Sequence, residues 1–161
     1  MQLALTPANP SDNPFLKDLF CHVRAPEFSA LQLPPTALNQ LLDMQYRAQK
    51  LGYAGQFPSA EDAIVRIDGQ PAGRLLIARS ITEIHIIDIA LLDSYRNQGI
   101  GATLLRTLSE EARATNKTLS LSVHFANPAQ RLYRRLGFTP TANDGINITM
   151  AWAAEHNTSS E

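Results

Sequence analysis

The most constraining feature of this sequence is an apolar run, a glycine-containing turn and an amphipathic segment in immediate succession. Residues 84–92 are rich in branched aliphatic side chains, which is typical of a buried strand. Gly99 and Gly101 follow, and after them apolar residues recur at helical spacing. A second apolar run, residues 119–123, comes next. This order predicts a parallel strand pair joined by a right-handed crossover.

The flanking segments supply further strands and helices. Asp68 and Gly69 predict a hairpin turn between two strands. Gly52 predicts the end of a helix that begins near Thr36, with a loop after it. The full expectation is a strand at 2–6, a helix from Ser11 or Asp12, a helix at 36–50, a loop at 53–60, strands at 63–67, 73–78, 84–92 and 119–123, helices after Gly99 and at 129–136, and strands at 138–141 and 146–152. We therefore predict an α/β (α+β) fold with a mixed, mostly antiparallel central sheet and helices on both faces.

Composition limits the class of protein. A chain of 161 residues with 44% hydrophobic residues fits one domain over residues 1–161 with a full core, followed at 153–161 by a polar tail. The net charge of -1 argues against nucleic-acid binding. Cys21 is the only cysteine, which excludes an intrachain disulfide and a Cys-based zinc site. No run suits a membrane span or a signal peptide, so we expect a cytoplasmic protein without a membrane partner.

The charge is unevenly distributed along the chain. Residues 96–135 carry a net +5, and the rest of the chain carries -6. A local positive field suits a small polyanionic ligand. Solvated helix faces are the alternative explanation for the same pattern.

The turn at residues 96–102 has the chemistry of a phosphate site. A helix start presents unpaired backbone N–H groups and the positive end of the helix dipole, and glycine allows a ligand to approach closely. A P-loop is a poor fit because no lysine follows these glycines, and a dinucleotide fingerprint is a poor fit because position 104 is leucine. The sequence therefore favours another phosphate-containing ligand.

Two separated motifs resemble those of one family. Residues 96–101, RNQGIG, resemble the Q/R-x-x-G-x-G/A coenzyme-binding motif of the GNAT superfamily of N-acetyltransferases. Residues 127–138 resemble that family's second motif, N-x-x-A-x-x-L-Y-x-x-x-G-F, with one residue fewer between the asparagine and the alanine. The resemblance covers residues 61–152 closely and residues 1–60 by element order alone. Ser94 departs from it, since many members carry proline or an acidic residue there.

The resemblance implies acetyl-CoA as co-substrate and no metal. Residues 61–152 would form the acetyl-CoA-binding core and residues 1–60 the substrate-side helices. The pyrophosphate would bind backbone N–H groups of the turn, the pantetheine arm would pair with the strand before it, and a backbone N–H near Leu91 would stabilise the tetrahedral oxyanion. The implied cofactor-binding residues are Ile89, Ala90, Leu91, Arg96, Asn97, Gln98, Gly99, Ile100, Gly101, Ala102, Asn127, Ala129 and Tyr133.

The resemblance also suggests groups for proton transfer. Tyr133 matches the position that protonates the leaving thiolate in many members. The alternative is that Tyr133 is only one of the four residues of an apolar helix stripe, with Ala129, Leu132 and Leu136. The amine must lose a proton, and Asp88 is the first candidate for the base because a carboxylate in an apolar strand is costly unless it is paired or useful. Alternatively, Asp88 has a structural role and its carboxylate is hydrogen-bonded to a neighbouring loop or an arginine. Glu83 and His85 are further candidates for the base, and a water chain to bulk solvent would require none of them.

Acceptor recognition is expected from the first 60 residues. Arg24, Glu27 and Tyr53 are the candidate substrate-binding residues, and Arg24 and Glu27 are one helical turn apart and able to pair. We predict transfer of acetyl to a primary amine of a small molecule, peptide or protein, by direct attack. A non-catalytic acyl-CoA-binding module is the alternative. Dimerisation is common in similar proteins, so the sequence leaves open whether this protein forms a homodimer.

Overall fold

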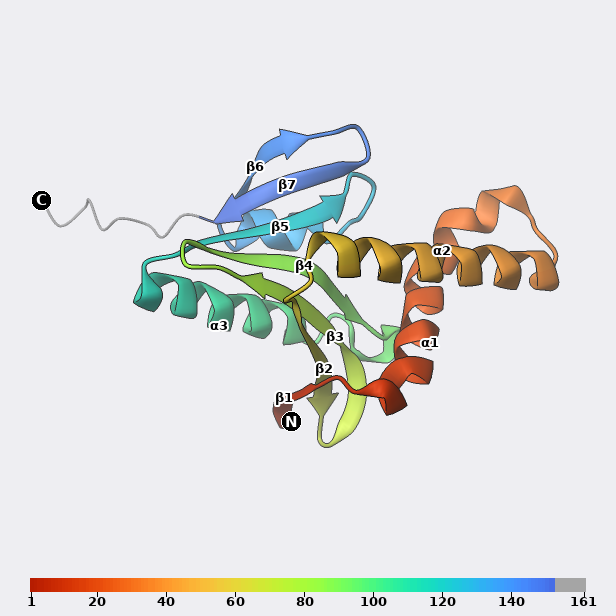
Figure 1. Cartoon of the computed structure of the whole chain (residues 1–161), viewed down its shortest axis with the longest axis horizontal. Coiled ribbons are helices and arrows are strands. Elements are labelled where there is room, and N and C mark those ends of the chain that lie inside the picture. The colour runs from red at the N-terminus through yellow and green to blue at the C-terminus, as the bar shows by residue number, and fades with distance from the viewer. Residues whose placement is uncertain (153–161) are drawn as a thin grey trace, which may run out of the picture. The chain divides into compact units, whose positions relative to one another are not determined.

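The computed structural model describes residues 1–152, and the predicted tail at 153–161 lies outside them. The strands form one seven-stranded sheet in the order β1-β2-β3-β4-β5-β7-β6. The elements are β1 Leu3–Pro7, α1 Asn13–Arg24, α2 Pro35–Gln56, β2 Glu61–Ile67, β3 Gln70–Arg79, β4 Glu83–Leu91, α3 Ile100–Thr115, β5 Thr118–His124, α4 Gln130–Arg135, β6 Phe138–Asn143 and β7 Asn147–Trp152 (Figure 1). The predicted order of strands and helices and the mixed sheet are confirmed.

The chain divides into two compact units. Unit 1 comprises residues 1–76 and 89–98, and unit 2 comprises residues 77–88 and those from 99 onward. The expectation of a single domain over residues 1–161 stays a prediction.

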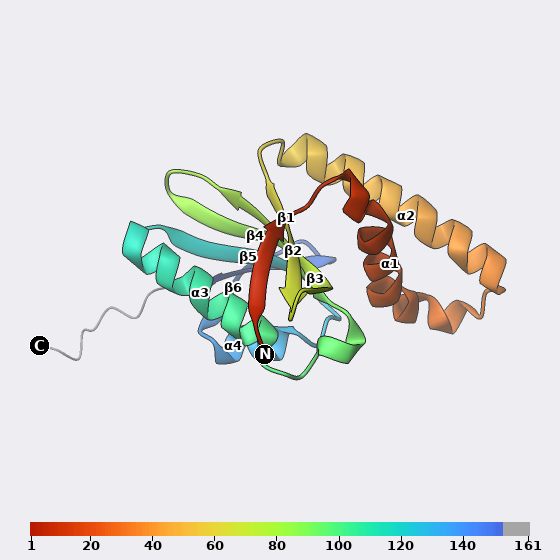
Figure 2. The same cartoon turned by 90° about the horizontal axis from the view of Figure 1, so that it is seen from below.

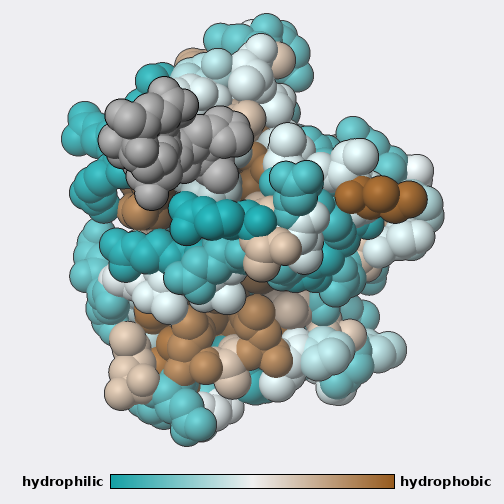
Figure 3. Space-filling view, turned by 90° about the vertical axis from the view of Figure 1, so that its left-hand side faces the viewer, coloured by the Kyte–Doolittle hydropathy of each residue, from teal (hydrophilic) through white to brown (hydrophobic). Residues whose placement is uncertain are grey.

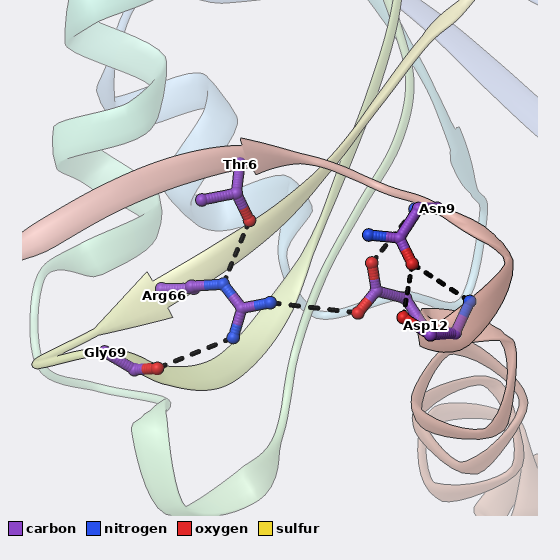
Figure 4. A network of polar contacts seen from close by, with 6 residues as sticks. Thr6, Asn9, Asp12, Arg66 and Gly69 are labelled. Atoms are coloured by element: carbon purple, nitrogen blue, oxygen red, sulfur yellow. Dashed lines mark hydrogen bonds and ion pairs between the residues drawn. The ribbon is translucent and has the colours of Figure 1, made fainter.

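In unit 1, an arginine ties the first strand to the hairpin beside it. β1 pairs antiparallel with β2, along which it lies in Figure 2. Arg66 Nε donates to Thr6 Oγ1 at 2.9 Å, and the guanidinium also reaches the Gly69 carbonyl and, at 3.7 Å, the Asp12 carboxylate (Figure 4). Asp12 in turn accepts from the backbone N–H of Asn9. One half-buried cation therefore holds together a strand, a turn and the residues that precede α1.

The start of the first helical segment differs from the sequence-based expectation. The helical segment begins at Pro10 and not at Ser11 or Asp12, and Asn9 provides its side-chain cap, since Asn9 Oδ1 accepts from the Ser11 N–H at 2.9 Å. The capped segment, residues 10–12, is a short 3-10 turn that leads into α1. Asn9 and Asp12 form a capping box. The sequence analysis missed it because it placed the start of the helix at Ser11 or Asp12.

The second helix is longer than predicted. Gly52 is predicted to end it, but α2 continues to Gln56, so the first half of the predicted loop at 53–60 is helical. A glycine inside a helix costs only about 1 kcal/mol relative to alanine, which packing elsewhere offsets. The helix ends where Phe57 precedes Pro58, because proline disfavours helical geometry at the residue before it. Proline, rather than glycine, is the stop signal here.

Gly73 permits a close approach of β3 to the end of β4 within unit 1. A Cβ at Gly73 would lie 2.2 Å from the Ala90 carbonyl oxygen and 2.7 Å from Leu91 Cδ2. The Leu92 N–H donates to the Ala72 carbonyl at 2.8 Å beside this contact. The position of the last residues of β4 thus depends on the missing side chain.

Unit 2 has an apolar layer on one side of β5. Leu119, Leu121 and Val123 are buried, as are Met150 on β7 and Leu105 on α3. β5 pairs antiparallel with β7 along its whole length, from Leu119 opposite Trp152 to His124 opposite Asn147. Hydrophobic residues also reach the surface of the molecule, where Figure 3 shows them gathered between hydrophilic ones.

The glycines give a direct test of these contacts. Gly73→Ala should lower the free energy of unfolding by about 1–3 kcal/mol, because the added methyl overlaps the Ala90 carbonyl. Gly55→Ala, in open space inside α2, should raise it by about 0.5–1 kcal/mol. Urea denaturation measures both, and equal effects would contradict the close approach.

Candidate functional site

The parallel pair at the centre of unit 2 is short. β4 and β5 are in register from Glu83 opposite Thr118 to Ile86 opposite Leu121. Both strands continue past this point, β4 to residue 88 within the unit and β5 to His124. Among the described residues of unit 2, no further β4–β5 partners follow. The backbone edges of the two strands beyond Ile86 and Leu121 are therefore available to hydrogen-bond a ligand.

The helix that follows presents backbone donors. α3 begins after Gly99, whose φ of 80° is left-handed and whose position has no side chain to cap the helix. The first N–H groups of a helix have no partner within it, and the helix dipole favours an anion there. Gly101 is close to α4, since a Cβ on it would meet Leu132 Cδ2 at 3.5 Å. Ile100 contributes only its backbone to this surface, because its side chain is buried.

The loop before α3 is held by its own side chains. In unit 1, Arg96 Nε donates to the Leu91 carbonyl at 3.1 Å and its Nη1 lies 2.9 Å from Asp93 Oδ1. Gln98 Nε2 donates to the Ser94 carbonyl at 2.7 Å, and Asn97 has a left-handed φ of 60°. Arg96 and Gln98 therefore shape the turn, which the sequence pattern alone did not indicate.

The end of β4 also belongs to unit 1. Ile89, Ala90 and Leu91 are all partly exposed, and Gly73 fixes the position of the last two. Their predicted role in holding a pantetheine arm through the backbone stays a prediction.

Tyr133 is shielded from solvent in unit 2. Its side chain is buried, and its ring makes an edge contact with Phe138 at 6.2 Å between centroids. Burial, together with the negative charge of Asp88, raises the pKa of the Tyr133 phenol to about 12. The structure thus brings the two predicted catalytic residues into electrostatic contact within one unit, and the phenol stays protonated at neutral pH.

The other predicted base candidates form a hydrogen-bonded chain. Ser120 Oγ donates to Glu83 Oε2 at 2.9 Å, and His85 Nδ1 lies 2.7 Å from the same Ser120 oxygen. Burial lowers the pKa of His85, while the charge of Glu83 opposes that shift. The sequence analysis missed Ser120. The alternation of Ser120, Ser122 and His124 with apolar neighbours was the signal that could have identified it.

Asn127 organises the start of α4. Its Oδ1 accepts from the Ala129 N–H at 2.9 Å, and its N–H donates to the His124 carbonyl. Asn127 and Ala129 therefore lie together in the turn between β5 and α4, at the end of the open edge of β5.

The predicted substrate-binding residues lie in unit 1. Arg24 Nη1 is 3.5 Å from Glu27 Oε2, so the predicted pair forms. Arg24 also lies over the ring of Phe20 at 5.3 Å. Tyr53 is in the last turns of α2, where the sequence predicted a loop. Their role toward an acceptor stays a prediction.

Comparison with known proteins assigns the family. A model of the acetyltransferase (GNAT) domain matches residues 59–140, half of the chain. The chain belongs to the GNAT acetyltransferase family. A protein of Bacillus subtilis (strain 168), whose name assigns it provisionally as a ribosomal protein bS18-alanine N-acetyltransferase, is 35% identical over 85 residues. That match covers 52% of this chain and 56% of the relative, so it spans about half of each protein.

Solved structures of GNAT proteins share the fold. The PaiA N-acetyltransferase of Thermoplasma acidophilum, crystallised with coenzyme A, has a TM-score of 0.71 at 16% identity and covers 96% of this chain and 100% of its own. A GCN5-related N-acetyltransferase of Rhodopseudomonas palustris has a TM-score of 0.67 at 17% identity, over 96% and 97% of the two chains. At these identities the similarity establishes a GNAT fold.

Metal-binding clusters and membrane-spanning helices are both absent from residues 1–152 of the GNAT chain. Within residues 1–152, no three histidine, cysteine, aspartate or glutamate side chains gather to hold a metal ion. Over the same residues, no helix combines the length and the hydrophobicity needed to cross a bilayer.

The raised pKa of Tyr133 predicts how stability depends on pH. A phenol whose folded pKa lies above its unfolded value near 10 stabilises the fold fully below pH 10, and this contribution is lost as pH rises to 12. Wild-type protein should therefore lose about 2–3 kcal/mol more than Tyr133→Phe between these pH values. Urea titrations at each pH measure this difference, and parallel curves would contradict the burial.

Proposed function

We propose that this protein transfers an acetyl group from acetyl-CoA to a primary amine. The observation that carries the proposal is the parting of β4 from β5 after Ile86 and Leu121. The parted edges can pair with the amides of a pantetheine arm as an added strand would. A few residues on, the uncapped start of α3 offers N–H groups to a pyrophosphate.

The individual contacts proposed here are those that the resemblance to the family implies. The backbone of Ile89, Ala90 and Leu91 would pair with the pantetheine amides. The pyrophosphate would bind N–H groups of residues 98–102. Arg96, held by Leu91 and Asp93, would keep positive charge beside that turn, and Asn127 would border the arm from the end of β5.

The reaction is direct acyl transfer. A neutral amine nitrogen attacks the thioester carbonyl carbon, a C–N bond forms, and the C–S bond breaks. A backbone N–H at the end of β4 stabilises the tetrahedral oxyanion. No covalent intermediate with the protein is needed.

Tyr133 would protonate the leaving thiolate. A phenol with a pKa of about 12 gives up its proton reluctantly, since an ordinary thiol has a pKa near 8.5. The same burial also raises the pKa of the CoA thiol beside it, which narrows the difference between the pKa values of the phenol and the thiol. The negative charge of Asp88 contributes to the high pKa of the phenol.

The acceptor is proposed to be the amino group of a peptide. The relative from Bacillus subtilis is named for an alanine of ribosomal protein bS18. We therefore choose a peptide with N-terminal alanine as the first acceptor to test. We also propose that the reaction takes place in the cytoplasm. Arg24, Glu27 and Tyr53 would contribute to its recognition.

Calorimetric titration tests the co-substrate. Acetyl-CoA and CoA should bind, and ATP should not. Gly101→Val should weaken acetyl-CoA binding at least tenfold, about 1.4 kcal/mol, because the added side chain lies at the start of α3. Gly55→Val, in open space on α2, should leave binding unchanged. Wild-type affinity in Gly101→Val would contradict the proposed pyrophosphate site.

Tyr133→Phe separates binding from chemistry. The variant should bind acetyl-CoA normally and should lower kcat by about a hundredfold, as expected for loss of a general acid. Release of free thiol with the alanine peptide measures kcat. An unchanged kcat would exclude Tyr133 as the acid, and acetyl-CoA binding without turnover of any amine would indicate a non-catalytic acyl-CoA-binding protein.

A further inference from the structure

The short helix α4 in unit 2 carries a dense positive charge. Three of its six residues are arginines, Arg131, Arg134 and Arg135, and all three are exposed. Within residues 1–152, their side chains form no hydrogen bond, ion pair or ring contact. Arg113 on α3, in contrast, lies over the ring of Trp152 at 5.6 Å. In the described part of the chain, the arginines of α4 are therefore available to bind an anion.

Two of these arginines share a face of α4 that borders the start of α3. Successive residues of a helix are rotated by about 100° around its axis, so Arg131 and Arg135, four residues apart, lie on one face. Both are on the same side of Leu132. Leu132 Cδ2 is beside α3, since a Cβ on Gly101 would meet it at 3.5 Å. Arg134 is two residues from Leu132 and therefore lies on the opposite face of α4.

In the free protein, this pair of arginines is electrostatically unfavourable. Like charges four residues apart on a helix repel each other. Arg131 is also in the first turn of α4, where the helix dipole favours an anion over a cation. Arg134 and Arg135 are in the last turn, where a cation is favourable. The dipole therefore accounts for basic residues at the end of α4 but not for Arg131, whose position an anion bound by Arg131 and Arg135 would stabilise.

A phosphate monoester suits two adjacent guanidinium groups. It carries close to two negative charges at neutral pH and three terminal oxygens, which guanidinium groups bind with paired N–H donors. Coenzyme A contains one such group, on the 3′ oxygen of the ribose whose 5′ oxygen carries the pyrophosphate. One ribose ring therefore separates the two phosphate-binding positions. The contact of Leu132 with Gly101 likewise places the arginine pair beside the start of α3, where the pyrophosphate is proposed to bind.

We propose that Arg131 and Arg135 bind the 3′-phosphate of the coenzyme, so that the protein prefers CoA and its thioesters to their 3′-dephospho forms. This inference rests on the proposed function, since it needs the pyrophosphate at the start of α3. Arg134 has the same charge but faces away from this site and takes no part in binding. Part of the net charge of +5 in residues 96–135 thus has a ligand of its own.

A comparison of CoA with 3′-dephospho-CoA tests the site directly. In calorimetric titrations of the wild-type protein, CoA should bind at least tenfold more tightly than 3′-dephospho-CoA, and added salt should reduce this ratio. Arg131→Gln and Arg135→Gln should each weaken CoA binding about tenfold and leave the affinity for 3′-dephospho-CoA unchanged. That unchanged affinity also shows that each variant is folded. An equal loss of affinity for the two ligands would overturn the proposal.

Arg134→Gln is the matched control variant. It removes the same charge from the same helix, on the opposite face, so a loss that depends on net charge alone should appear in it as well. Arg134→Gln should keep the wild-type ratio of the two affinities. A loss of CoA affinity in Arg134→Gln as large as that in Arg131→Gln would overturn the proposal in favour of a general electrostatic effect.

The same titrations separate this inference from the proposed function. Equal affinities of the wild-type protein for CoA and 3′-dephospho-CoA would refute the 3′-phosphate site and leave the proposed function in place. If neither ligand bound the folded protein, both proposals would be refuted. If Arg131→Gln bound CoA normally but lost acetylation of the N-terminal alanine peptide, the arginine would act on the acceptor and the inference would be wrong.

Discussion

The structure of unit 2 depends on a parallel strand pair that ends early. β4 and β5 share four register positions, and each strand then continues without the other. Parallel strands elsewhere satisfy their backbone groups by running together to their ends, because unpaired N–H and C=O groups away from water are costly. Here β7 satisfies the outer edge of β5 to its last residue, so the open edge is confined to one side. A coenzyme that carries amides of its own can complete such an edge at little cost.

The two faces of β4 near this point have different physical character. One face continues the apolar layer and contains Asp88, whose charge is felt by the buried phenol of Tyr133. The other face holds Glu83, His85 and Ser120 in one hydrogen-bonded chain. Acyl transfer to an amine needs a proton acceptor for the nucleophile and a proton donor for the leaving group. Strand alternation alone separates these two sets of side chains.

Sequence patterns predicted much of this arrangement, since they report local geometry. The glycine turn before α3, the Asp68–Gly69 hairpin and the order of the elements follow from spacing that neighbouring residues determine. Contacts between distant residues were less accessible. To predict the hydrogen-bonded chain through Ser120, one must know the register of β4 and β5, which a helix separates in the sequence. To predict the approach of Ala90 to Gly73, one must know how the end of β4 lies against β3. The predicted end of α2 at Gly52 was wrong because packing outweighs the helix propensity of one glycine. A proline, in contrast, restricts the backbone directly.

The alternation along β5 has a consequence for how this strand can change its length. Leu119, Leu121 and Val123 face the core, and Ser120, Ser122 and His124 face the polar side. Deletion or insertion of a single residue would exchange the two sets beyond it, burying serines and a histidine and exposing leucines. Changes by two residues preserve the faces. A change of β5 by one residue therefore needs a bulge to restore the two faces, whereas a change by two residues does not.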